Sequence, residues 1–191
     1  MLGTLQPLTL DMDVPKHRDY HLYWSITDRC QLFCQYCFYR KGVRTSPHHS
    51  DVRGDLCQLR NALSDMKSVF GQITLTGGEP LMSASFWDVL GVCAALGYKT
   101  GITTNGILLN ESSISRLAEL GVDKISVSLD SLDSSVNEWL RPHQDFRDYT
   151  AHVVRMVKML AKLHKRPSVT LLQTITAENL KCFEQMLHFA W

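Results

Sequence analysis

The sequence predicts an α/β fold built on a parallel sheet. Strand-like and helix-like segments alternate five times along the 191 residues, and no hairpin signal joins neighbouring strands. This alternation is typical of βα units, in which consecutive strands run parallel. Right-handed crossovers would curl such a sheet into a barrel or arrange it as a doubly wound layer. With 45% hydrophobic residues, the chain is sufficient for one domain with a real core.

Each expected element has its own local signal. The expected strands are residues 21–27, 72–76, 99–104, 124–129 and 168–174. Candidate N-caps precede four helices, at Asp51, Ser85, Asn110 and Thr176. Gly97 and Gly121 are expected to end the helices that begin at Ser85 and Asn110. A further helix is expected over about 146–164, and residues 139–142 are expected to be irregular. The first helix is expected to carry Leu56, Leu59, Leu63 and Met66 on its apolar face, and the last to carry Leu180, Phe183 and Leu187.

Polar and glycine residues gather where the expected strands end, while the strand bodies are apolar. These ends carry a cysteine-rich loop, Gly77 to Pro80, Thr104 with Asn105, Ser128 with Asp130, and Gln173 with Thr174. In parallel barrels the active site lies at the carboxyl ends of the strands. We therefore expect the functional site at this rim.

Three cysteines, Cys30, Cys34 and Cys37, follow the first expected strand with C-x3-C-x2-C spacing. Thiolates suit iron–sulfur clusters or zinc. A cubane cluster is usually held by four cysteines, so three would leave one iron with an open position for a substrate or cofactor. The alternative is a structural Cys3His zinc site with His48 or His49 as the fourth ligand.

The second expected strand runs directly into Gly77-Gly78-Glu79-Pro80. Glycines allow the backbone to approach a ligand closely because no Cβ intervenes. Pro80 has no backbone N–H and ends the ladder, and Glu79 supplies an acceptor at the end of the strand. Taken alone, these four residues could also form an ordinary turn.

Together the two motifs resemble the radical S-adenosylmethionine (SAM) superfamily, and Tyr36 matches the aromatic residue common before its last cysteine. The resemblance is closest to the branch of the molybdenum-cofactor GTP cyclase and the peptide maturases. It implies a partial (β/α) TIM barrel, usually of six βα units, of which five are visible. Residues 1–19 are then a lead-in and 20–191 the radical SAM core domain, with the C-terminal end of the barrel expected to be missing.

The resemblance also implies the cofactors, a 4Fe–4S cluster on Cys30, Cys34 and Cys37, and SAM on its open iron. Reductive cleavage of SAM would give a 5′-deoxyadenosyl radical that abstracts hydrogen from the substrate. Residues expected to contact SAM are Tyr36, Gly77, Gly78, Glu79, Pro80, Thr104, Asn105, Ser128 and Asp130. Alternative structural roles are ring packing for Tyr36, a satisfied strand hydroxyl for Ser128, a turn for Asn105 and a cap for Asp130. Arg141 lies where relatives often have Leu-Arg-Gly, but Pro142 replaces the glycine.

The resemblance implies a flavodoxin- or ferredoxin-like electron donor as partner, and an unidentified peptide or small molecule as substrate. The GTP cyclase would carry basic residues where this chain has Tyr23 and Thr74, so GTP cyclisation is not expected. A nucleotide-modifying enzyme similar to viperin also shares these motifs. A non-catalytic, truncated relative that binds only the cluster is a further alternative, beside the zinc-binding module.

Composition narrows the remaining function classes. Lys and Arg number 20 against 19 Asp and Glu, a net charge of +1, which argues against a dedicated nucleic-acid or membrane-surface binder. No stretch is long and apolar enough to span a bilayer. Six cysteines, three clustered and three scattered, are not a disulfide framework and fit a reducing compartment such as the cytoplasm. The scattered Cys57, Cys93 and Cys182 are expected to be small buried hydrophobes.

Overall fold

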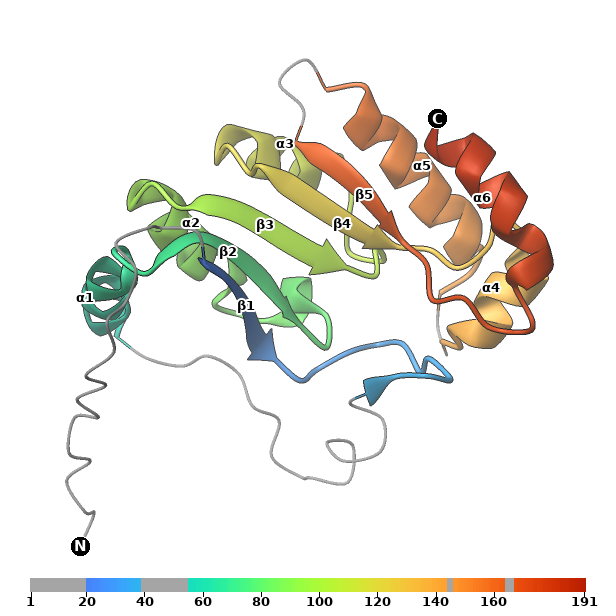
Figure 1. Ribbon diagram of the computed structural model, residues 1–191, viewed down its shortest axis with the longest axis horizontal. Helices are drawn as coiled ribbons and strands as arrows, with labels where there is room; N and C mark the ends of the chain where they lie inside the picture. Colours follow the sequence, from blue (N-terminus) through green and yellow to red (C-terminus); the bar gives the residue numbers. More distant parts are fainter. Residues whose placement is uncertain (1–19, 39–54, 144–145, 164–166) are drawn as a thin grey trace, which may run out of the picture.

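Five parallel strands form a single sheet in the order β1-β2-β3-β4-β5 (Figure 1). The structure is a computed structural model that describes residues 20–38, 55–143, 146–163 and 167–191. The strands are β1 Tyr20–Thr27, β2 Phe70–Gly77, β3 Lys99–Thr104, β4 Lys124–Ser128 and β5 Ser168–Leu172. The helices are α1 Leu56–Met66, α2 Phe86–Ala95, α3 Glu111–Glu119, α4 Ser134–Leu140, α5 Tyr149–Ala161 and α6 Phe183–Ala190.

The strand order distinguishes between the two expected architectures. Each strand pairs with its neighbour in sequence, so the order never reverses as it does in a doubly wound sheet. β1 does not pair with β5 in the described part of the chain, and the sheet is therefore open. The predicted parallel α/β fold with the form of a partial barrel is confirmed.

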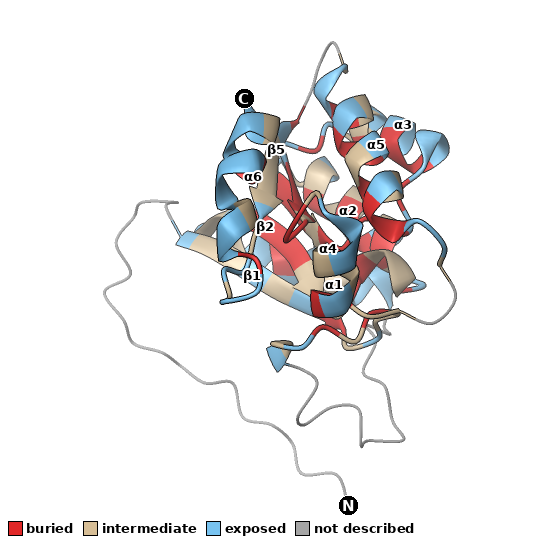
Figure 2. Ribbon diagram, turned by 90° about the vertical axis from the view of Figure 1, so that its right-hand side faces the viewer, coloured by how far each residue is buried: buried red, intermediate tan, exposed pale blue. Residues whose placement is uncertain are grey.

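The two faces of the sheet differ in chemistry. One face is apolar and packs against the helices; its central residues, each at most 1% exposed, are Ile73, Leu75, Ile102, Ile125 and Val127. Helices α2, α3 and α5 lie together on this side (Figure 1), and buried residues line their inward surfaces (Figure 2). Alternate strand residues point to the opposite face, which is rich in serine and threonine.

Helices α2 and α3 form as their local sequence predicts. Phe86, Val89, Leu90 and Cys93 of α2 are all buried, and both helices are followed by glycines with positive φ, Gly97 and Gly121. Asn110 forms a reciprocal capping box with Ser113 at the start of α3. Ser85 occupies the N-cap position of α2 without a side-chain hydrogen bond.

The beginning of α1 differs from the expectation. Its N-cap is Asp55, whose side chain accepts from the N–H of Cys57, whereas the expected Asp51 lies outside the described residues. Leu63 is the buried member of the expected apolar face and Leu56 is 46% exposed, because α1 covers only the edge of the apolar layer and packs on α2. Cys57 is consequently exposed, so its predicted burial is wrong; Cys93 is buried and Cys182 is intermediate.

Two further segments correct the predicted elements. Residues 134–140, expected to end in irregular structure, form α4, which Asp133 caps through the N–H of Ser135. In the last segment a 3₁₀ turn, Leu180–Cys182, precedes α6, and the Asn179 side chain accepts from the N–H of Thr176. Because a 3₁₀ turn advances by three residues, the helical phase counted from Thr176 is wrong.

The expected apolar face of α6 therefore points away from the core. Leu180, Phe183 and Leu187 are 61%, 38% and 48% exposed, while Met186 is 4% exposed and belongs to the core. The boundaries of α5 and β5 also shift inward: α5 begins at Tyr149 rather than 146, and β5 ends at Leu172 rather than 174. No helix among residues 20–38, 55–143, 146–163 and 167–191 is long and apolar enough to cross a membrane.

Candidate functional site

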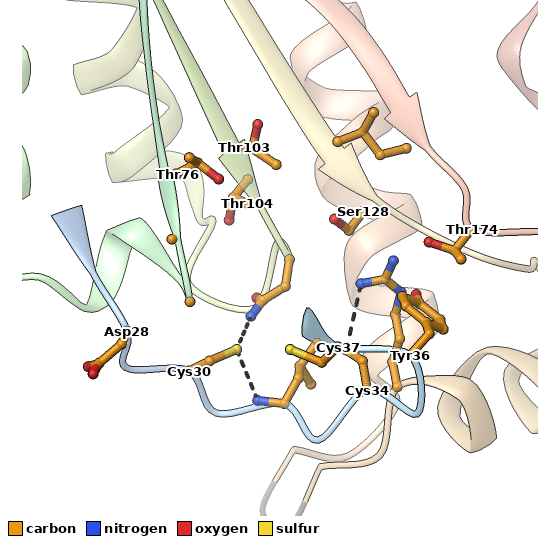
Figure 3. A pocket seen from close by; sticks show the side chains of 16 residues that line it. Asp28, Cys30, Cys34, Tyr36, Cys37, Thr76, Thr103, Thr104, Ser128 and Thr174 are labelled. Atoms are coloured by element: carbon orange, nitrogen blue, oxygen red, sulfur yellow. Dashed lines mark hydrogen bonds between the residues drawn. The ribbon is translucent and has the colours of Figure 1, made fainter. Parts of the chain in front are cut away.

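A pocket opens at the carboxyl ends of the strands, as expected for a parallel barrel (Figure 3). The loop after β1 contributes the three cysteines and Tyr36, and the four other strands contribute residues at or just after their ends. The lining residues are Asp28, Cys30, Leu32, Cys34, Tyr36, Cys37, Thr76, Gly77, Gly78, Thr103, Thr104, Asn105, Ser128, Arg141, Leu172 and Thr174. Residues far apart in the sequence, from Asp28 to Thr174, thus meet at one site.

The cysteine loop is fastened to the segment that ends α4. The N–H of Phe33 donates to the carbonyl of Pro142 at 2.7 Å, and the N–H of Gln35 donates to the carbonyl of Leu140 at 2.9 Å. The side chain of Leu32, 2% exposed, anchors the same loop in the core. The loop is thereby held by its backbone on either side of Cys34.

Hydrogen-bond donors surround two of the three sulfurs. The Sγ of Cys30 lies 3.4 Å from the N–H of Leu32 and 3.7 Å from Nδ2 of Asn105. The Sγ of Cys34 lies 3.9 Å from a guanidinium nitrogen of Arg141. Donors of this kind stabilise negative charge on cluster-bound sulfur and influence the reduction potential of the cluster.

Burial raises the pKa of the Cys34 thiol to about 11, although the nearby Arg141 lowers it. Burial also raises the pKa of Cys30. These thiols therefore carry their protons in the metal-free protein near neutral pH. A bound metal deprotonates its thiol ligands, so metal loading should release protons.

The three cysteines share one cavity, the arrangement in which an iron–sulfur cluster is bound. In the described ranges no three histidine, cysteine, aspartate or glutamate side chains are gathered around one point as a single-ion site requires. Each cysteine of a cubane binds a different iron, so such ligands line a common cavity instead. Cys30, Cys34 and Cys37 do line one pocket. His48 and His49, the alternative zinc ligands, lie outside the described residues.

Gly77 and Gly78 occupy positions where a side chain would collide with the chain entering the cysteine loop. A Cβ on Gly78 would lie 2.3 Å from the carbonyl oxygen of Arg29, and one on Gly77 would lie 2.1 Å from that of Thr27. The N–H of Gly78 donates to Thr27 at 2.8 Å. The glycines therefore allow β2 to contact the start of the loop, and both line the pocket.

Glu79 and Pro80 lie behind the pocket wall rather than in it. The carboxylate of Glu79 is fully buried and accepts from the hydroxyl of Thr104 at 2.8 Å, the N–H of Asn105 at 2.7 Å and the N–H of Leu81 at 3.2 Å. Burial raises the pKa of Glu79 to about 7, against these hydrogen bonds, which lower it. The Glu79 side chain joins the ends of β2 and β3.

Thr104 and Asn105 line the pocket beside the cysteine loop. The amide of Asn105 faces this loop, since its Nδ2 lies near Cys30 and 3.3 Å from Oε1 of Gln31. Its Oδ1 accepts from the N–H of Ile107, which confirms the expected turn role. Asn105 thus serves the turn and the cysteine loop together.

Ser128 lines the pocket, but Asp130 lies beneath it. Asp130 is fully buried and pairs with Arg141, whose Nε and Nη2 lie 2.7 and 3.2 Å from its two carboxylate oxygens. Tyr36 donates its hydroxyl to the same carboxylate, and the N–H of Thr174 donates to it at 2.9 Å. Asp130 therefore does not face the pocket itself; it holds in place the side chains that do.

Sequence reasoning missed several members of this site. Thr76 and Thr103 line the pocket and could have been found, because they alternate with buried apolar residues along their strands. Asn179, which is buried and donates to the backbone carbonyls of Asp130 and Thr174, gave no such signal. The pairing of Arg141 with Asp130 was likewise invisible in the sequence.

The family model of the radical SAM superfamily matches residues 24–190. The chain belongs to the radical SAM superfamily. Members of this superfamily use a 4Fe–4S cluster and SAM, which agrees with the expected cofactors. The match covers every residue that lines the pocket and all of the sheet except the first four residues of β1, 20–23.

Two curated relatives illustrate the range within this radical SAM family. A protein of Pyrococcus furiosus described as "Tungsten-containing aldehyde ferredoxin oxidoreductase cofactor-modifying protein" is 30% identical over 176 residues, 88% of this chain and 47% of its own length. The GTP 3′,8-cyclase of Corynebacterium glutamicum is 34% identical over 116 residues, 58% of this chain and 30% of its own length. The chain thus spans about half or less of these relatives.

The fold is similar to that of solved radical SAM proteins. Streptococcus suis SuiB, solved with bound S-adenosylmethionine, matches with a TM-score of 0.72 at 20% identity, covering 89% of this chain and 37% of SuiB. BtrN in complex with AdoMet and 2-DOIA matches with a TM-score of 0.56 at 20% identity, covering 80% and 56%. At these identities the likeness concerns the fold.

Proposed function

We propose that the protein is a radical SAM enzyme acting on a peptide or small molecule. The observation that carries the proposal is the convergence of Cys30, Cys34 and Cys37 with the Gly77-Gly78 wall in one pocket at the strand ends. The cluster and SAM would supply the 5′-deoxyadenosyl radical that removes a hydrogen atom from the substrate. The chain itself holds the cluster, shapes the SAM pocket and restricts access of water to it.

The residues divide into direct and indirect roles. Gly77, Gly78, Tyr36, Thr104, Asn105 and Ser128 line the pocket and are assigned to direct contact with SAM. Glu79, Pro80 and Asp130 are assigned supporting roles, because the pocket lining does not include them. Glu79 holds the β2–β3 rim and Asp130 orients Arg141 and Tyr36.

The open face of the sheet next to the pocket supports a substrate other than GTP. Tyr23 and Thr74 are register partners on β1 and β2, and the ring of His21 lies 2.7 Å from the Thr74 hydroxyl. Arg141 is the single basic side chain among the described lining residues, and Asp130 neutralises it. A triphosphate would require free cations at such a surface. We therefore assign the substrate to peptides or small molecules without a triphosphate.

The proposal includes an electron donor of the flavodoxin or ferredoxin type, since the cluster must be reduced before SAM is cleaved. It also takes residues 20–191 as the radical SAM core domain and 1–19 as a lead-in. A cluster-binding, non-catalytic relative is the competing function and predicts little cleavage of SAM.

The test is reductive SAM cleavage by anaerobically reconstituted protein, with methionine and 5′-deoxyadenosine quantified per bound iron. We expect both products in equal amounts from wild type and neither from Cys34→Ala. Cys57→Ala is the matched control, because Cys57 is exposed and lies outside the pocket, and it should behave as wild type. A cluster without products would favour the non-catalytic relative, and zinc in place of iron would favour the zinc-binding module.

A further inference from the structure

A buried cation lies directly beside one of the three cysteines. Arg141 is 6% exposed, and its Nη1 lies 3.9 Å from the Sγ of Cys34. An arginine is permanently charged, and burial of a cation is costly unless it is paired. The electrostatic effect of the guanidinium on the Cys34 sulfur therefore depends on how the guanidinium is paired and oriented.

Among the described residues, the carboxylate of Asp130 binds one edge of the guanidinium, and the ring centroid of Tyr36 lies 5.5 Å from its central carbon. Its Nε and Nη2 bind the two oxygens of Asp130, while Nη1 remains on the side of Cys34. In this fork the cation stands between the sulfur and the carboxylate that neutralises it. The pair thus directs its positive end at the cysteine and its negative end away from it.

Several contacts fix this orientation. Tyr36 donates its hydroxyl to Asp130 and the N–H of Thr174 donates to the same carboxylate at 2.9 Å. On the other side, the carbonyls of Leu140 and Pro142 bind the backbone of the cysteine loop at 2.9 and 2.7 Å. The residues on either side of Arg141 are therefore hydrogen-bonded to the residues on either side of Cys34. These bonds fix the distance between the guanidinium and the Cys34 sulfur.

We propose that Arg141 is a positioning residue that raises the reduction potential of the cluster through Cys34, and that Asp130 moderates this effect. The inference rests on the proposed cluster. Reduction adds one electron from the reductant to the cluster and neither forms nor breaks a bond. A nearby positive charge stabilises the added negative charge, and more strongly where water is excluded. The paired carboxylate opposes part of this stabilisation.

The two partners consequently predict shifts of opposite sign. Arg141→Met removes the cation and should lower the potential, so the ratio of reduced to oxidised cluster at a fixed potential should fall at least tenfold, or 59 mV for a one-electron couple. Asp130→Asn removes the opposing charge and should raise the potential. Arg141→Lys keeps the charge but loses the fork, and should lie between wild type and Arg141→Met.

The experiment is an anaerobic redox titration of the reconstituted protein, without SAM, followed by electron paramagnetic resonance and normalised to bound iron. Arg116→Met is the matched control, because Arg116 is exposed on α3 and contacts Trp87 outside this site; it should leave the potential unchanged. A purely structural role for the pair would reduce cluster content without opposite shifts.

Unchanged potentials, or shifts of the same sign in Arg141→Met and Asp130→Asn, would overturn the inference. If Arg141→Met retains no cluster, the test uses Arg141→Lys and Asp130→Asn, whose reduction potentials should again shift in opposite directions from that of wild type. Wild-type protein that binds no cluster would overturn the proposed function itself, and this proposal with it. A wild-type cluster with unshifted variants would overturn only the role of Arg141.

Discussion

Replacing Gly78 by alanine tests how closely the end of β2 must approach the cysteine loop. The added Cβ would lie 2.3 Å from the carbonyl oxygen of Arg29 and 2.7 Å from that of Asp28. Both atoms belong to the backbone, so no side chain can rotate away. The loop must move by about 1 Å to restore an ordinary contact of about 3.4 Å between carbon and oxygen.

The cost follows from the contacts that this movement disrupts. The N–H of Gly78 donates to Thr27 at 2.8 Å and the N–H of Glu79 donates to Arg29 at 2.7 Å. Overpacking costs about 1–3 kcal/mol, and weakening two buried hydrogen bonds adds roughly 1 kcal/mol or more. We expect Gly78→Ala to lower the free energy of unfolding by about 3 kcal/mol, a fall in Tm of about 6–12 °C for a chain of this size.

The assay is urea denaturation and thermal melting of the apoprotein, followed by iron content after reconstitution. Gly91→Ala in α2 is the matched control, because nothing lies within 4 Å of its added Cβ. It should stabilise the protein by roughly 0.5–1 kcal/mol through helix propensity. Gly78→Ala with wild-type stability and full iron loading would refute the proposed close approach.

Three further substitutions test other contacts around the pocket. Glu79 has an ordinary pKa of 4.5 and a pKa of about 7 in the folded protein, so the folded state binds the carboxyl proton more tightly, and wild-type stability should fall by roughly 3 kcal/mol as pH rises from 4.5 to 7. Glu79→Gln should abolish this pH dependence, measured by urea denaturation at pH 5 and pH 8. The same change in stability between the two pH values in wild type and variant would contradict the burial of the Glu79 carboxyl. Tyr149→Phe removes a 3.0 Å hydrogen bond to the carbonyl of Asn105 and should cost about 1 kcal/mol of stability by thermal melting, whereas no loss would show the bond to be dispensable. Asn110→Ala removes the α3 capping box with Ser113 and should lower the free energy of unfolding by about 1 kcal/mol without changing iron content. A loss of iron would show that the start of α3 is coupled to the cysteine site.

Much of the fold could be predicted because the strands carry strong local signals. Segments in which apolar and polar residues alternate, such as 72–76 and 124–128, end in glycine or polar residues, and parallel strands bring these ends to one rim. The cysteine loop and Gly77-Gly78 were placed in one pocket by this reasoning, and the structure brings them together. Local signals also identified the caps and glycines of α2 and α3.

The remaining features depend on tertiary contacts. The burial of Glu79 arises because the turn directs its carboxylate toward Thr104 and Asn105, which a strand-end position does not reveal. The pairing of Asp130 with Arg141 depends on where α4 ends, and α4 was itself missed. The phase of α6 depends on a 3₁₀ turn, so its exposed face could not be counted from the sequence.

The most direct test of the central claim is an electron paramagnetic resonance spectrum of the reconstituted, reduced protein with and without SAM. If Cys30, Cys34 and Cys37 leave one iron of a 4Fe–4S cluster open beside Gly77 and Gly78, the cluster signal should appear and should change when SAM is added. A cluster signal that SAM does not alter, or zinc bound in place of a cluster, would contradict the claim.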